Sequence, residues 1–66
     1  MYSITFSNGT GLLESDLNKA KKLVINVVKA ASNDFFGRIH PLDEDGYEEG
    51  IIFEATNREG TALCGF

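Results

Sequence analysis

The residues of this chain that could do chemistry are a dense run of carboxylates and two isolated side chains of catalytic type. Residues 43–49 read Asp-Glu-Asp-Gly-Tyr-Glu-Glu, while Cys64 is the only cysteine and His40 the only histidine. Carboxylates can exchange protons or hold a cation, and a cysteine can act as a nucleophile beside a histidine base. A crowded negative edge can also attract a basic protein surface.

The spacing of these residues argues against catalysis and against a metal site. Acid–base work needs a cleft that shifts the pKa of one carboxyl group, and 66 residues leave little room for one. A calcium loop of the EF-hand type starting at Asp43 would need glycine at its sixth position, but Gly46 is the fourth. Cys64 shares its expected strand face with Ala62 and Phe66, which favours a small core residue. We therefore expect a non-enzymatic protein without metal or cofactor.

A nucleotide-binding loop is also disfavoured. Gly9-Thr10-Gly11 follows an expected strand and precedes an expected helix, as phosphate-binding loops do. The third glycine of the dinucleotide pattern would fall at Glu14, whose charge would repel a phosphate, and the lysine of a P-loop is missing. The stretch is interpreted as a turn.

Size and composition indicate one small domain that spans residues 1–66. Hydrophobic residues make up 42% of the chain and charged residues 24%, as in ordinary globular proteins. A chain this short buries only about 60% of its unfolded surface, and a single cysteine cannot form an internal disulfide, so self-association is an open possibility. No apolar run approaches the ~20 residues of a membrane span, and the N-terminus does not resemble a signal peptide. A cytoplasmic protein is expected.

The first half of the chain predicts a strand followed by a helix. Apolar and polar residues alternate over residues 2–6, which predicts a half-buried strand, and residues 7–11 break it. Apolar residues then recur at helical spacing over residues 17–31. Ser15 is the expected N-cap of this helix, and Ser32-Asn33 is its expected end. Ile25 falls on the polar side of the helix.

The second half predicts three strands joined by short connections. Strands are expected over residues 35–40, 51–56 and 61–66, with a type I turn over residues 57–60 and a charged loop between the first two strands. The predicted fold class is α+β, with a single helix packed on one face of a three- to four-stranded antiparallel sheet in the order β-α-β-β-β. Ile51, Phe53 and Ala55 would share the face that the helix covers. The other face would carry three apolar side chains among polar ones: Phe36, Ile52 and Leu63.

Charge is distributed unevenly along the chain. Residues 16–31 hold four lysines and one acid, a local net charge of +3, whereas residues 34–66 hold eight acids and two arginines, a local net charge of −6. Lys19, Lys22 and Lys29 could contact phosphates, but an overall charge of −4 repels nucleic acid at long range. The acidic stretch would instead be steered toward a basic protein, with Tyr47 as its anchor.

In these features the chain resembles small, acidic, non-enzymatic inhibitors encoded by bacteriophages, anti-CRISPR proteins in particular. The resemblance lies in the short length, the helix SDLNKAKKLVINVVKAAS, the segments FFGRIHPL and GIIFEATNREGTALCGF, and the acidic DEDGYEE. It implies a protein that binds a nuclease or its RNA-guided complex and blocks access to DNA.

The leading hypothesis is therefore an interaction protein that inhibits a basic, nucleic-acid-handling partner. The predicted contact residues are the acids and the tyrosine of the loop, with Glu54 or Glu59 as possible additions: Asp43, Glu44, Asp45, Tyr47, Glu48 and Glu49. One alternative is a nucleic-acid-binding module that uses the lysines of the helix. Another is a structural or antitoxin-like subunit that dimerises through the apolar residues of the open sheet face or through an open strand edge. Monomer and homodimer both remain open.

Overall fold

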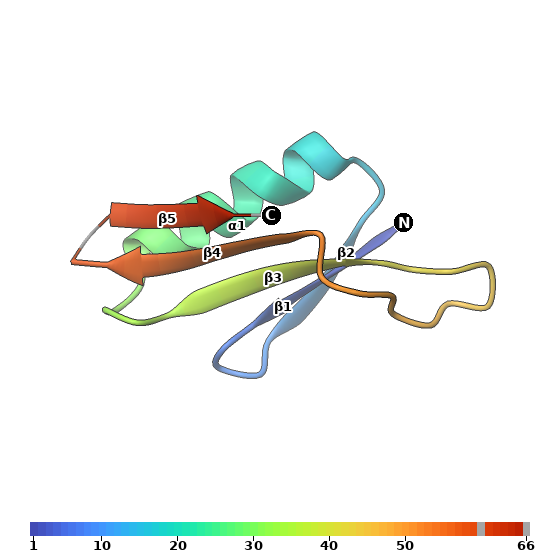
Figure 1. Ribbon diagram of the computed structural model, residues 1–66, viewed down its shortest axis with the longest axis horizontal. Helices are drawn as coiled ribbons and strands as arrows, with labels where there is room; N and C mark the ends of the chain where they lie inside the picture. The colour runs from blue at the N-terminus through green and yellow to red at the C-terminus, as the bar shows by residue number, and fades with distance from the viewer. Residues whose placement is uncertain (60, 66) are drawn as a thin grey trace.

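The computed structural model describes residues 1–59 and 61–65, and Figure 1 shows one helix lying across one face of an antiparallel sheet. The sheet has five strands in the spatial order β2-β1-β3-β4-β5, with every neighbouring pair antiparallel. The elements along the chain are β1 (Tyr2–Phe6), β2 (Gly11–Glu14), α1 (Leu17–Ala30), β3 (Phe36–Pro41), β4 (Phe53–Arg58) and β5 (Thr61–Gly65). The predicted α+β class, with a single helix on one face of an antiparallel sheet, is confirmed.

The sheet has one strand more than the sequence predicted, because residues 11–14 form β2 where only a connection to the helix was expected. The turn before β2 is built on Asn8-Gly9: Gly9 has a φ of +89°, and the N–H of Thr10 donates to Asn8 Oδ1 at 3.0 Å. The Phe6 N–H donates to the Thr10 carbonyl at 2.9 Å and closes the hairpin. The chain order is therefore β-β-α-β-β-β.

Helix α1 begins one residue later than predicted and ends earlier than predicted. Asp16, not Ser15, is the N-cap, because its carboxylate accepts the N–H groups of Asn18 and Lys19. The helix ends at Ala30, before the predicted Ser32-Asn33. Asn57 of β4 supplies the missing donors: its Nδ2 lies 2.8 Å from Val28 O, 3.3 Å from Lys29 O and 3.1 Å from Ala31 O.

The core lies between α1 and the central strands. Its fully or nearly fully buried apolar side chains come from β1, α1, β3 and β4: Ile4, Phe6, Ala20, Val24, Val28, Ile39, Phe53 and Ala55. Ile25, expected on the polar side, packs partly buried against this cluster. Gly37 of β3 permits the close approach of helix and sheet, since a Cβ there would lie 2.9 Å from the Phe6 ring and 3.0 Å from Val24 Cγ1.

Three predictions for the C-terminal part were wrong. Asn57 lies inside β4 opposite Ala62 and is only 2% exposed, although the sequence suggested the start of a turn. Ile51, expected on the buried face with Phe53, lies outside β4 and is exposed. Cys64, expected in the core, is exposed as well. Phe66, its expected companion, lies outside the described residues, as does the side chain of Ala62.

Candidate functional site

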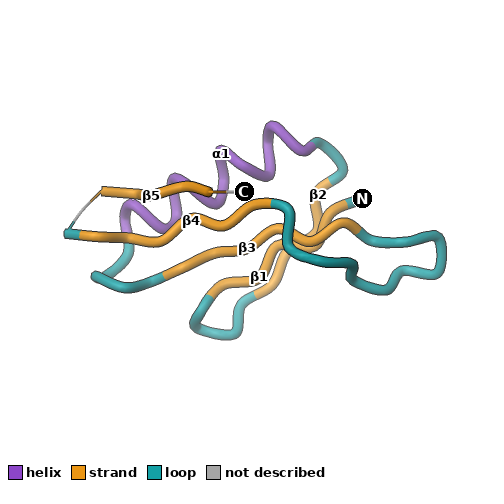
Figure 2. Tube along the Cα trace, viewed as in Figure 1, coloured by secondary structure: helices purple, strands orange, loops and turns teal. Residues whose placement is uncertain are grey.

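The predicted contact residues lie together in an ordered projection, residues 42–49, which we name the acidic hairpin. In Figure 2 it is the long loop between β3 and β4 that extends beyond the end of the sheet. Leu42 pairs with Glu48 in an antiparallel bridge, and the Glu49 N–H donates to Pro41 O at 2.8 Å. The two arms of the hairpin therefore extend the pairing between β3 and β4 beyond the end of the sheet.

The tip of the acidic hairpin is held by the side chain of Asp43. Its Oδ1 accepts the N–H groups of Asp45 and Tyr47, each at 2.9 Å. The backbone adds bonds from Asp43 N to Tyr47 O at 2.9 Å and from Gly46 N to Asp43 O at 3.1 Å. Gly46 has a φ of +85°, a conformation that glycine adopts without a steric cost. Asp43 is thus first a structural residue of the turn, and its charge is partly satisfied there.

The base of the acidic hairpin is attached to the sheet face that α1 leaves open. Ser3 Oγ of β1 donates to Glu48 Oε1 at 3.0 Å. His40 Nδ1 of β3 lies 3.0 Å from the carbonyl oxygen of Glu49 and 3.9 Å from Glu48 Oε2. Because a carbonyl oxygen only accepts, the first of these contacts requires a hydrogen on Nδ1. Two central strands therefore set the direction in which the hairpin projects.

The acids of the hairpin are not neutralised by the lysines or arginines of the same chain. Within residues 1–59 and 61–65, the ion pairs join Arg38 to Glu54, Arg58 to Asp34, and His40 to Glu48. Only the last involves the hairpin, and the histidine carries charge only when protonated. Over the same part of the chain, the carboxylates of Glu44, Asp45 and Glu49 have no hydrogen-bonding or ionic partner.

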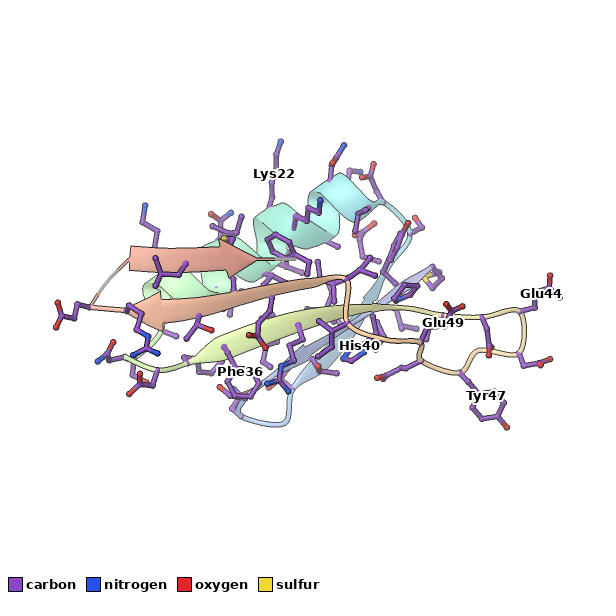
Figure 3. All side chains as sticks on the ribbon, in the orientation of Figure 1. Lys22, Phe36, His40, Glu44, Tyr47 and Glu49 are labelled. Carbon is purple, nitrogen blue, oxygen red and sulfur yellow. The ribbon has the colours of Figure 1, made fainter. Side chains whose placement is uncertain are left out.

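Tyr47 lies on the returning arm of the acidic hairpin and is 72% exposed. In Figure 3, Glu44 lies at the tip and Tyr47 farther back on this arm, with their side chains pointing to different sides, while Lys22 points away from the sheet on the far side of α1. The exposed phenol and the unpaired carboxylates are therefore presented together, away from the positive side of the protein. All six predicted contact residues are brought together, but Asp43 and Glu48 also have structural roles.

Ser3, His40 and Glu48 superficially match a nucleophile, a base and an acid, yet their geometry differs from a catalytic triad. In a triad the histidine lies between the hydroxyl and the carboxylate, so that it can take the hydroxyl proton. Here the carboxylate of Glu48 itself accepts the Ser3 hydroxyl. Within the described part of the chain, no group of three or more His, Cys, Asp or Glu side chains is arranged to hold a metal ion.

The residues of the two alternative hypotheses lie elsewhere. Lys19, Lys22 and Lys29 are exposed along α1. On the open sheet face, Leu63 is exposed, whereas Phe36 is half-buried under the guanidinium of Arg38, 4.3 Å from the ring centroid. Ile52, expected on the same face, is half-buried and packs against the buried core cluster. The nucleic-acid and dimerisation hypotheses both stay predictions.

Sequence reasoning missed the anchoring role of Ser3 and His40 and the whole of β2. Ser3 and His40 are cross-strand partners in the β1–β3 register, a pairing that local patterns do not reveal. The β2 strand did have a signal, since Asn-Gly between apolar residues is a strong hairpin indicator.

Comparisons with protein-family models, with curated proteins and with solved structures find no match to this chain. Within the described residues, no helix has the length and apolar character needed to cross a membrane.

Proposed function

We propose that this protein is a non-enzymatic inhibitor that binds a basic, nucleic-acid-handling protein through its acidic hairpin. The observation that carries the proposal is the projection of unpaired carboxylates and an exposed tyrosine on a backbone that is already ordered. Ordering of the tip by Asp43 and of the base by Ser3 and His40 lowers the entropy that a partner would have to remove on binding.

The mechanism follows from the charges of the hairpin and of its target. A protein groove that holds nucleic acid carries lysines and arginines that contact phosphates. Carboxylates at the tip would pair with those same cations, and opposite potentials would speed the encounter. Tyr47 would then bury its ring against the partner while its hydroxyl keeps a polar contact, as interface tyrosines do. A bound hairpin would thereby exclude DNA from the groove.

RNA-guided nucleases of the CRISPR type are the proposed partner class, in line with the resemblance to anti-CRISPR proteins. Such complexes hold nucleic acid in positively charged channels, which the negative charge of the hairpin complements. The proposal includes a location in the cytoplasm of a bacterial host, where these complexes act.

The proposal is tested by comparing two charge-altered variants in affinity capture and in an inhibition assay. Glu44→Lys/Asp45→Lys changes two tip residues whose side chains have no partner in the described structure, so the hairpin itself should persist. Asn26→Lys is a control that adds positive charge on the exposed side of α1, away from the acidic hairpin. The wild type and the control should capture a basic CRISPR effector complex from a host lysate and block its binding to target DNA.

The double variant should bind the same complex about 10–100-fold more weakly, with a shallower dependence on salt, because like charges would face each other. Tyr47→Ala should weaken the complex mainly through faster dissociation. Equal binding by the wild type, the double variant and Tyr47→Ala would exclude the acidic hairpin as the contact.

A further inference from the structure

Strand β2 forms an outer edge of the sheet that lacks the usual protection. An antiparallel strand with one neighbour turns the amide groups of alternate residues outward, where another strand can bind them. Lysine or proline commonly blocks such pairing, but β2 reads Gly-Leu-Leu-Glu. Leu12 is 44% exposed and Leu13 66% exposed, so the edge is also apolar.

The two leucines lie on opposite faces of the sheet, and neither is fully covered. Leu12 pairs with the buried Ile4 and therefore lies on the face that α1 covers. The helix packs mainly over β3 and β4 and least over β2. Leu12 thus continues the apolar layer of the core past the part of the sheet that α1 covers. Leu13 pairs with Ser3 and lies on the open face.

A shallow hollow of about 480 Å³ lies beside this edge on the open face. It is bordered by residues of β1 and β2 and by the acidic hairpin: Ser3, Thr5, Gly11, Leu12, Leu13 and Glu48. Gly11 leaves the hollow open because it has no side chain. A Cβ at this position would meet only Ile4 O at 3.6 Å, an ordinary contact, so the fold itself does not require glycine there.

The hydrogen-bonding pattern limits how β2 could pair with an identical strand. The Phe6 N–H donates to Thr10 O, so the backbone groups of Thr10, and by alternation those of Leu12, face β1. The backbone groups of Gly11 and Leu13 then face outward. Outward groups must meet outward groups, and of the twofold antiparallel pairs that this rule allows, the one centred on Leu12 sets Gly11 opposite Leu13 in both directions, with Leu12 opposite Leu12 on the twofold axis.

We propose that β2 is a self-association edge, through which a second copy of this chain extends the five-stranded sheet to ten strands. In the register just derived, Leu13 of each copy stands opposite Gly11 of the other, beside the hollow that Gly11 leaves open. The protruding Leu13 and the open position at Gly11 lie two residues apart on the same strand, as a self-complementary twofold interface requires. Glu14 faces the uncharged Thr10 of the second copy, so no like charges oppose each other along the strand pair.

The extent of this interface predicts a weak dimer. Pairing of four-residue strands covers much less than the ~800 Å² per partner of a standard interface, so dimerisation should depend on concentration. Each chain carries a net charge of −4, and salt should therefore strengthen the dimer by screening the repulsion. Binding of a basic partner by the acidic hairpin has the opposite salt dependence, which separates this proposal from the proposed function.

Sedimentation equilibrium at concentrations up to about 1 mM tests the dimer directly. The wild type should dimerise, and Gly11→Val, whose Cβ would make only an ordinary contact in the monomer, should weaken dimerisation at least tenfold. Leu13→Thr should do the same, whereas Leu63→Thr, which alters an exposed leucine on the opposite edge strand, should not. Circular dichroism checks that each variant is folded.

Disulfide trapping in a Cys64→Ser background tests the register. Leu12→Cys should form an intermolecular disulfide on mild oxidation, because strand pairing would bring the two Cα atoms within the distance that a disulfide spans. Leu13→Cys should not, since it would face Gly11. A wild type that stays monomeric at about 1 mM, or a Leu63→Thr variant as weakened as Leu13→Thr, would overturn the proposal, and trapping at residue 13 instead of residue 12 would overturn the register.

Discussion

Replacement of Asn57 should destabilise the protein more than its position near a surface turn suggests. Its Nδ2 group, with two hydrogens, lies within 3.3 Å of three carbonyl oxygens at the end of α1, and the residue is 2% exposed. Asn57→Ala would remove this donor from the part-buried Lys29 and Ala31 carbonyls, at about 1–2 kcal/mol each, while Val28 O would keep the N–H of Ala31. The expected loss is therefore about 2–4 kcal/mol, against a total stability of about 3–10 kcal/mol for a chain of this length.

Urea unfolding followed by circular dichroism at neutral pH measures this loss. With a slope of about 1 kcal/mol per M, the midpoint should fall by about 2–4 M. Asn57→Asp should be worse, because an ionised carboxylate would face the negative end of the helix dipole. Asn26→Ala on the exposed side of α1 is the control and should change stability by less than about 0.5 kcal/mol. An Asn57→Ala midpoint within 0.5 M of the wild type's, roughly the resolution of the assay, would refute the capping role.

Two further predictions concern the packing of the sheet. Gly37→Ala should cost about 1–3 kcal/mol, because its Cβ would press on the Phe6 ring and on α1, whereas Gly50→Ala, with no atom within 4 Å of its Cβ, should be near neutral in the same unfolding assay. Ser3→Ala should release the carboxylate of Glu48 to solvent and cost about 0.5–1.5 kcal/mol, and amide hydrogen exchange should quicken selectively in the acidic hairpin. Equally faster amide exchange over the whole chain, or unchanged exchange in the acidic hairpin, would contradict that anchoring.

The parts of the fold that could be predicted from sequence are those in which periodicity decides burial. The α1 face that includes Ala20, Val24 and Val28 is buried as its spacing indicated, and so is the alternation through Phe53 and Ala55. The predicted cap and the predicted end of the helix were both wrong by one or two residues. The cap depends on competition between neighbouring side chains, and the end depends on a distant strand. Asp16 takes the bonds that Ser15 could also have made, and a distant strand provides the donors at the other end.

Other features depend on contacts between residues far apart in the chain and could not be predicted from local patterns. Asn57 has turn-forming chemistry, but it lies 29 residues after the Val28 carbonyl that it binds. The attachment of Glu48 to Ser3 spans 45 residues. A charged loop was predicted at these residues by composition alone, and the pairing that makes it an ordered hairpin was not. Its order depends on where β1 and β3 place a hydroxyl and an imidazole.

The acidic hairpin contributes no residue to the buried apolar cluster, and it is attached to the sheet at its base, through the end of β3 and the contacts of Glu48 and Glu49 with Ser3 and His40. Loops of this kind tolerate replacement because little of the folding free energy depends on them. The length and residue types of segment 43–47 can therefore diverge while the helix-on-sheet body stays folded. Substitutions in this one segment could then adapt the protein to changes on the surface of its proposed partner. The rest of the sequence would be constrained separately, by the need to fold.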